Sequence, residues 1–272
     1  MAFGLLCRLA RVRVTMVYAI LLVAVTTTLL KLGPDVQGRV LQHASTNLHN
    51  LSHGHVGTLL GSAFVVDAGP MYVWLPGLIC LLGAGELIWR SGRLLVAFAV
   101  GHVGATLLVA SGLTAAVRFG WLPGAVSRAI DVGTSYGATS VLGALTPAVP
   151  TRWRPTWIGW WLAVAAVLIA GGTDFTGVGH VVALILGMVV ATRFGRPRRW
   201  TPARLALLAV GGSFGYSILV SSEGAMVLAA AAGLAGGALG TVVTLLHSLL
   251  HPQSPIRRQE ADSWVPTVGL RE

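Results

Sequence analysis

Charged side chains are scarce in this sequence. Only 10% of its 272 residues are acidic or basic, whereas an ordinary soluble domain has about 25%, and 54% are hydrophobic. A chain of this length cannot bury that much apolar surface in a soluble core, so lipid must solvate much of it. The composition therefore excludes a soluble domain and predicts an all-α, polytopic transmembrane protein.

Cysteine is almost absent as well. Cys7 precedes the first apolar run and Cys80 lies inside another, so the sequence indicates neither a disulfide framework nor a cysteine metal site. Four histidines gather in the first long loop, at His43, His49, His53 and His55. Their spacings fit no regular metal pattern, so a solvated interfacial loop is the favoured interpretation and a metal site on the outer face is the alternative.

Apolar runs set the expected topology, because a spanning helix needs about 20 mostly apolar residues. The first run follows Arg8, Arg11 and Arg13 without an obvious small-residue cleavage site, which indicates an uncleaved anchor. The run Gly57–Val66 is too short to span and is expected to be re-entrant or interfacial. The expected spans are Val14–Leu32, Met71–Trp89, Leu94–Leu113, Val132–Val149, Trp157–Ala170, Val178–Thr192, Ala203–Val220 and Gly224–Leu246.

Basic residues alternate with these spans as the positive-inside rule requires. With the N-terminus in the cytoplasm, 15 of the 19 basic residues fall in inner segments, so both termini are expected to be cytoplasmic. The net charge of +10 comes from the ends of apolar runs, which favours anionic lipid at the cytoplasmic face as a partner over nucleic acid. Few lysines and many arginines in a compact chain favour a bacterial plasma membrane.

Two polar residues stand out inside the expected spans. Ser135 lies four residues after Asp131 on the fourth span, and His180 lies six residues after Asp174 at the start of the sixth. Both spans run from outside to inside, so at 1.5 Å per residue each side chain lies roughly 6–9 Å below the outer boundary. Polar residues in a bilayer are costly and are functional candidates by default.

Small residues would let these two spans approach closely. Gly133 and Gly137 flank the serine, and Gly179, Ala183 and Gly187 accompany the histidine. Close backbones allow a serine–histidine hydrogen bond of about 3 Å, through which the imidazole can take the hydroxyl proton and make the serine a nucleophile toward a peptide carbonyl. The alternative is structural: a membrane serine commonly bonds to its own helix, and a histidine commonly packs against a neighbour.

The stretch from Gly133-Thr134-Ser135 to Gly143-Ala144-Leu145 resembles the fourth helix of rhomboid intramembrane proteases, where a Gly-x-Ser-Gly motif carries the nucleophile. His180 with Ala183 and Gly187 resembles the family's sixth helix. Gly83–Glu86, followed by Ser91–Leu94, resembles the link between its second and third helices. The resemblance covers about Val14 to Thr192 and leaves the last two spans as an addition.

The resemblance implies an organisation and an activity. Residues 1–13 would form a cytoplasmic tail, 14–194 a rhomboid-like six-helix core, 195–250 two extra transmembrane helices, and 251–272 a disordered cytoplasmic tail. Ser135 would be the nucleophile and His180 the general base of an intramembrane serine protease. Its substrates would be single-span membrane proteins, cleaved near the outer face with no metal and no organic cofactor.

The chain departs from the family at the groups around the serine. Tyr136 stands where the motif has its second glycine. The second-helix His and Asn that stabilise the oxyanion fall near Pro70 and Trp74, or at Thr58 and Ser62 if an insertion is allowed. Loss of such donors typically costs about two to three powers of ten in rate.

Substitute oxyanion donors are available in principle, namely the backbone N–H groups of Ser135 and Tyr136 or the side chains of Asn50 or His53. The second hypothesis is a catalytically inactive relative that binds or chaperones transmembrane helices. A small-molecule transporter ranks last, because the chain lacks paired broken helices and buried charge pairs.

Two further residues carry expectations. His102, near the middle of the third span, is expected to pack and to hydrogen-bond to a neighbouring helix; a haem shared with His180 fits poorly because the two histidines differ in depth. Glu86, at the inner end of the second span, is expected to form a helix-end salt bridge with Arg90 or Arg93.

Overall fold

The computed structural model describes residues 10–66, 71–128, 134–172, 175–220 and 223–250, and all regular structure in these ranges is helical. The expected all-α class is therefore confirmed. Helices long and apolar enough to cross a membrane occupy Ala10–Leu32, Met71–Arg118, Pro202–Leu219 and Ala225–Leu250, and Phe175–Ala191 is a shorter apolar helix. Length and composition together thus support a multi-pass membrane protein.

The first span is α2 (Arg13–Leu32), and the first loop folds into short helices beside it: α3 (Pro34–Ala44), α4 (Leu48–Ser52), α5 (Thr58–Gly61) and the 3-10 turn η2 (Ser62–Phe64). Gly33 has a φ of 91°, which lets the chain turn sharply between α2 and α3, and Pro34 then begins α3. The apolar run Gly57–Val66 contributes Thr58, Ser62, Ala63 and Val65 to the buried interior without crossing the molecule.

The second and third spans follow one another with almost no loop. Helix α6 (Met71–Ala99) contains one non-helical residue, Arg90, with φ 67° and ψ 163°, so its two parts are separate helical segments. The second part continues through a π turn, η3 (Val100–Gly104), into α7 (Ala105–Arg118). The expected end of the second span at Trp89 therefore agrees with the break.

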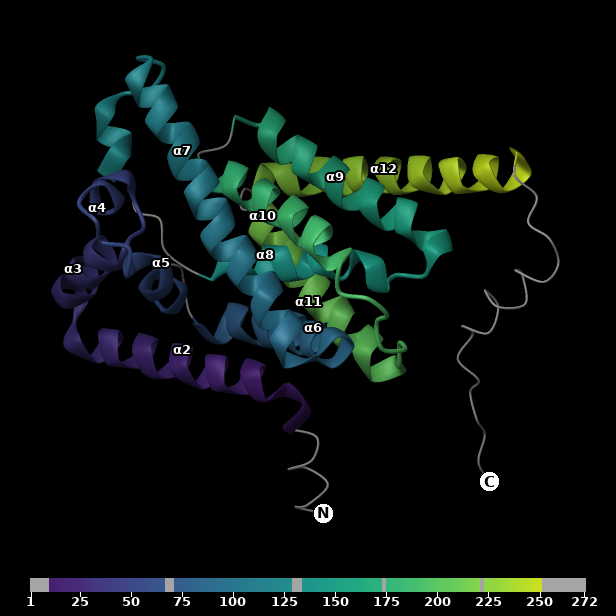
Figure 1. Ribbon diagram of the computed structural model, residues 1–272, viewed down its shortest axis with the longest axis horizontal. Coiled ribbons are helices and arrows are strands. Elements are labelled where there is room, and N and C mark those ends of the chain that lie inside the picture. Colours follow the sequence, from purple (N-terminus) through teal and green to yellow (C-terminus); the bar gives the residue numbers. More distant parts are fainter. Residues whose placement is uncertain (1–9, 67–70, 129–133, 173–174, 221–222, 251–272) are drawn as a thin grey trace.

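Helix α8 (Ser135–Ala144) lies at the centre of the molecule, and every residue from Tyr136 to Ala144 is buried. In Figure 1, α8 lies between α2 on one side and α12 on the other. The fourth span was expected to reach Val149, but the α-helix ends at Ala144 and a 3-10 turn, η5 (Thr146–Ala148), follows. Pro147 explains this correction, because proline cannot donate to the helix and disfavours α-helical geometry in the preceding residue.

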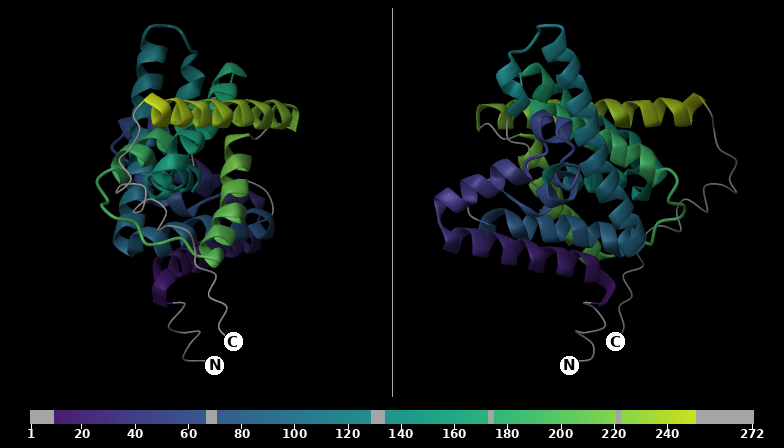
Figure 2. Two further views of the ribbon diagram at one scale, coloured as in Figure 1. Left: turned by 90° about the vertical axis from the view of Figure 1, so that its right-hand side faces the viewer. Right: turned by 60° about the vertical axis from the view of Figure 1, so that its left-hand side comes forward.

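Helices α9 (Arg154–Ala170) and α10 (Phe175–Ala191) complete the part of the chain that resembles a six-helix core. The last two helices, α11 (Pro202–Leu219) and α12 (Glu223–Leu250), attach to different partners. A Cβ on Gly211 would lie 2.6 Å from the Leu81 Cα, so α11 packs closely on α6. A Cβ on Gly236 would overlap the Gly159 carbonyl, so α12 packs on α9. In the left view of Figure 2, α11 stands upright below the horizontal α12.

Candidate functional site

The helices that carry the predicted serine and histidine pack backbone to backbone. A Cβ on Gly187 of α10 would overlap the carbonyl of Ser140, and a Cβ on Gly143 of α8 would overlap the carbonyl of Leu184. The expected close approach at Gly187 is therefore confirmed. Gly137 differs from expectation, because its open side faces the ring of Phe98 on α6. Gly133 lies outside the described residues.

At the Ser135 end of this interface, Tyr136 packs against His180. Their ring centroids are 5.2 Å apart and the rings meet edge to face at 78°. Both side chains are buried, with 3% of Tyr136 and 8% of His180 exposed. A Cβ on Gly179 would overlap the Tyr136 ring, so the tyrosine fits onto α10 because residue 179 has no side chain. The bulky residue at the motif's second glycine position thus lies beside the candidate base.

Ser135 is the first residue of α8 and is half-buried. The side of α8 that meets α10 carries Tyr136, Ser140 and Gly143. Successive residues of an α-helix are turned by about 100°, so Ser135 starts on the neighbouring side, together with Thr139 and Leu142.

That neighbouring side of α8 faces α11, since a Cβ on Gly215 would lie 2.7 Å from the Leu142 side chain. The structure therefore brings Tyr136 into contact with His180 and places Ser135 at the same end of the two helices. The direct Ser135–His180 hydrogen bond stays a prediction.

Asn50, a candidate substitute oxyanion donor, has its side chain engaged within the first loop. The Asn50 side-chain amide donates to the carbonyls of Gln42 at 3.0 Å and Ser45 at 2.7 Å, and its backbone N–H donates to Asn47 Oδ1 at 2.9 Å. His53 is exposed in that loop. Asn50 therefore acts in this structure as a loop-shaping residue.

Thr58 and Ser62 belong to a buried polar cluster that the sequence alone does not predict. Thr46 Oγ1 lies 3.0 Å from the Thr58 carbonyl and 2.9 Å from Ser62 Oγ, and Ser62 Oγ lies 3.1 Å from His102 Nε2. All four residues are at least nine-tenths buried. His102 is thus packed in the interior as expected, and its hydrogen-bond partner lies in the short 3-10 helix η2 of the first loop.

The π turn places His102 in this cluster. Its ring stacks on Phe98 with centroids 6.0 Å apart, and its carbonyl accepts a hydrogen bond from Thr106 Oγ1 at 2.7 Å. One extra residue in the turn rotates the side chains that follow, and such turns are frequent at functional sites. A histidine in a Gly-rich segment of a span indicates a buried polar site. Its hydrogen-bond partner could not be identified from the sequence, because that partner lies 40 residues away in the first loop.

Glu86 forms a different arrangement from the expected salt bridge. Its carboxylate is fully buried and accepts hydrogen bonds from the backbone N–H groups of Val14 at 3.0 Å and Thr15 at 2.9 Å. It also accepts from Thr15 Oγ1 at 2.7 Å and Ser91 Oγ at 2.6 Å. The first N–H groups of a helix lack internal partners and carry partial positive charge, so they attract the carboxylate more effectively than the exposed Arg90.

Comparison with known proteins agrees with this architecture. A family model described as rhomboid-like protein matches residues 9–200. That stretch takes in α2 to α10 and ends just before α11 begins at Pro202. Comparisons with curated proteins and with solved structures gave no match. Because the family model covers more than half of the chain, this membrane protein belongs to the family of rhomboid-like proteins.

Proposed function

We propose that this rhomboid-like protein binds single transmembrane helices of other membrane proteins without cleaving them. The observation that carries this proposal is the contact between Tyr136 and His180. A general base must lie about 2.6–3.2 Å from the hydroxyl it deprotonates, directly or through one water. A buried tyrosine ring on α8, that of Tyr136, packs directly against the imidazole.

Helix α11 also favours a non-catalytic role. Gly211 brings α11 against Leu81 of α6, and Gly215 brings it against Leu142 of α8. Leu142 lies on the side of α8 that begins with Ser135. At the outer end of α11, Leu219 and Val220 are buried at 0% and 2% exposure. A substrate helix that approached Ser135 from this side would have to displace a packed helix of the protein itself.

A groove between α9 and α11 offers a surface for a client helix. It has a volume of about 540 Å³ and includes Trp157, Trp160, Leu208 and Tyr216 in its lining. Ala209, Gly212 and Ser213 of α11 also line it, and small residues at this spacing let another helix backbone approach closely. Leu205 at its edge is 48% exposed, so the groove opens sideways toward lipid.

Site-specific photo-crosslinking in the native membrane tests this proposal. A photoreactive amino acid at Leu205, which lines the groove, should capture single-span proteins. The matched control is Val210 on the same helix, which is 49% exposed but lies outside the groove lining. Equal capture at both positions, or capture of no membrane protein at Leu205, would contradict the assignment of the groove.

A substitution that fills the groove provides the second test. A Cβ on Gly212 meets nothing within 4 Å, so Gly212→Leu should fold normally and project its side chain into the groove. The control is Gly112→Leu on α7, where a Cβ also meets nothing within 4 Å. Crosslinking at Leu205 should fall strongly in Gly212→Leu and stay unchanged in Gly112→Leu.

Serine hydrolysis is the second candidate function, because Ser135 and His180 lie at the same end of two helices in backbone contact. A fluorophosphonate that labels activated serines separates the two functions. Non-catalytic binding predicts no labelling of the folded wild-type protein. Labelling that is lost in both Ser135→Ala and His180→Ala, but kept in Ser111→Ala, would overturn that prediction and establish the protease. Ser111 is an exposed serine that bonds only to its own helix in the described residues.

The proposal includes a location. We place the protein in a bacterial plasma membrane with both termini in the cytoplasm, since arginines concentrate before α2, at the α6 break, before α9 and between α10 and α11. Client helices would therefore meet the groove inside the bilayer.

A further inference from the structure

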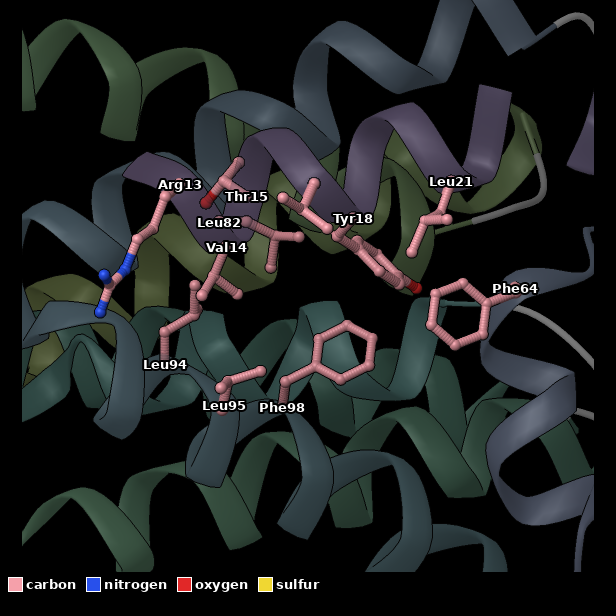
Figure 3. A pocket seen from close by; sticks show the side chains of 11 residues that line it. Arg13, Val14, Thr15, Tyr18, Leu21, Phe64, Leu82, Leu94, Leu95 and Phe98 are labelled. Carbon is pink, nitrogen blue, oxygen red and sulfur yellow. The ribbon is translucent and has the colours of Figure 1, made fainter. Parts of the chain in front are cut away.

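A second cavity lies between α2 and the two parts of α6, and neither Tyr136 nor His180 lines it (Figure 3). Its volume is about 390 Å³, within the roughly 300–1,000 Å³ typical of small-molecule sites. Its walls are almost entirely apolar and include Val17, Leu21, Leu82, Leu94, Leu95 and Phe98. Such walls suit a hydrocarbon chain and not a polar metabolite.

One end of the cavity is closed by aromatic rings. The Tyr18 ring meets Phe64 of the first loop with centroids 5.3 Å apart, and meets Phe98 of α6 at 5.2 Å. The Tyr18 hydroxyl donates a hydrogen bond to the Ala63 carbonyl at 2.6 Å, so the ring is held in place. A chain that enters the cavity therefore stops beneath the first loop.

One side of the cavity opens toward lipid. Val17, Leu95 and Leu21 line it and are 57%, 52% and 45% exposed, respectively. In a protein that crosses a bilayer, these side chains face hydrocarbon. The molecules with direct access to the cavity are therefore membrane lipids.

The other end of the cavity carries a positive charge. Figure 3 shows Arg13 and Phe64 at opposite ends of the lining. Arg13 is exposed, as is Arg90 at the break in α6. The nearby acid Glu86 is not part of the lining, and its carboxylate is directed to the start of α2 by hydrogen bonds from Val14 and Thr15. The mouth of the cavity is thus electrostatically suited to an anionic headgroup.

We propose that this cavity holds one anionic phospholipid, with an acyl chain along the groove and the phosphate paired with the Arg13 guanidinium. From Arg13 to Leu21 the groove follows eight residues of α2, roughly 12 Å of helix, which accommodates a substantial part of an acyl chain. The apolar walls bind the chain, and the arginine selects the headgroup charge. This site is independent of the client-helix groove, which lies between other helices.

Native mass spectrometry of the full chain in neutral detergent tests the headgroup contact. The probes are phosphatidylglycerol and phosphatidylcholine with identical oleoyl chains. Phosphatidylglycerol should bind preferentially, and Arg13→Gln should weaken its binding about fivefold, the change expected for one basic residue near an anionic surface. Arg11→Gln is the matched control, because Arg11 is also exposed but does not line the cavity. Equal binding of the two lipids, or equal effects of the two substitutions, would overturn the proposal.

A second pair of variants tests the acyl-chain contact. Leu21→Trp places a large ring at the cavity wall, whereas Ile20→Trp places it on the neighbouring lipid-facing residue, which is 61% exposed and outside the lining. Leu21→Trp should weaken phosphatidylglycerol binding at least tenfold, about the effect of losing two buried methylenes. Ile20→Trp should leave binding unchanged. Unchanged binding in Leu21→Trp would show that the lipid binds elsewhere.

Discussion

Thr15 and Glu86, which are 71 residues apart in the chain, are joined by two hydrogen bonds at the start of α2. The Glu86 carboxylate accepts from both the backbone N–H and the hydroxyl of Thr15, and it is completely buried. It thereby ties the start of α2 to the part of α6 just before the break at Arg90. Ser91, just after the α6 break, donates to the same carboxylate, so the second part of α6 also joins the contact.

Loss of this carboxylate should destabilise the whole bundle. Glu86→Ala leaves the buried donors of Thr15 and the part-buried donors of Val14 and Ser91 without their acceptor, so we expect the free energy of unfolding to fall by at least about 3 kcal/mol. Thr15→Val removes one donor and should cost roughly half as much. Unfolding of the purified protein in detergent measures both, and an Ala variant as stable as the wild type would contradict this account.

The Tyr136 ring and Gly179 should be energetically coupled. Gly179→Ala places a Cβ into the ring, and overpacking of this kind costs about 1–3 kcal/mol. In a Tyr136→Leu background the ring is absent, so the same alanine should cost much less. A double-mutant cycle of unfolding free energies measures this difference, and strictly additive effects would show that the two residues do not contact each other.

Two glycines in spanning helices should respond oppositely to alanine. Gly187→Ala directs a methyl group into the backbone carbonyl of Ser140, which cannot move aside as a flexible side chain could, so we expect a loss of at least about 2 kcal/mol in stability. Gly112→Ala meets nothing within 4 Å and should be neutral or stabilise by about 0.4–1 kcal/mol. Thermal unfolding of the two variants side by side checks the prediction.

The cluster beneath the first loop should hold that loop on the membrane core. Ser62→Ala removes a buried hydroxyl between Thr46 and His102, and we expect a loss of about 1–3 kcal/mol. Hydrogen exchange should speed up in the backbone of α5 and η2 more than in α8. An equal change in both regions would indicate global destabilisation and not release of the loop.

Labelling in intact cells should reveal the orientation. In a background with Cys7 and Cys80 replaced by serine, a cysteine at exposed Trp121 should react with a membrane-impermeant maleimide, because the proposed orientation puts the end of the third span outside. A cysteine at exposed Arg196, between α10 and α11, should react only after the membrane is opened. The reverse pattern would place the termini outside.

Local sequence signals were sufficient for much of the fold. The positions and lengths of the apolar runs predicted most of the helices. The family-like link after Glu86 predicted the break of α6 at Arg90. Pro147 explains why α8 ends at Ala144. The sequence suggested a longer helix because the apolar run continues past this proline. The spacing of small residues predicted Gly187 as a close-contact position. Two helices can approach closely only where small residues recur on the same face of the helix.

The site was less accessible from sequence, because its contacts join distant segments. Nothing near Glu86 in the chain indicates that its acceptor oxygens meet Val14 and Thr15. The same holds for Ser62 and His102, which approach only because the first loop folds down onto the π turn. Tyr136 was recognisable as a departure from the family motif, but its contact with His180 depends on the missing side chain of Gly179 in another helix.

The glycine contacts between α9 and α12 also bear on how the protein is made. Helix α9 is synthesised before α11 and α12. The surface of α9 around Gly159 therefore has no partner in the membrane until Gly236 of α12 is inserted. During that interval, the insertion machinery or lipid has to shield a surface shaped for a helix. Premature termination after α11 would leave that surface of α9 permanently without its partner helix.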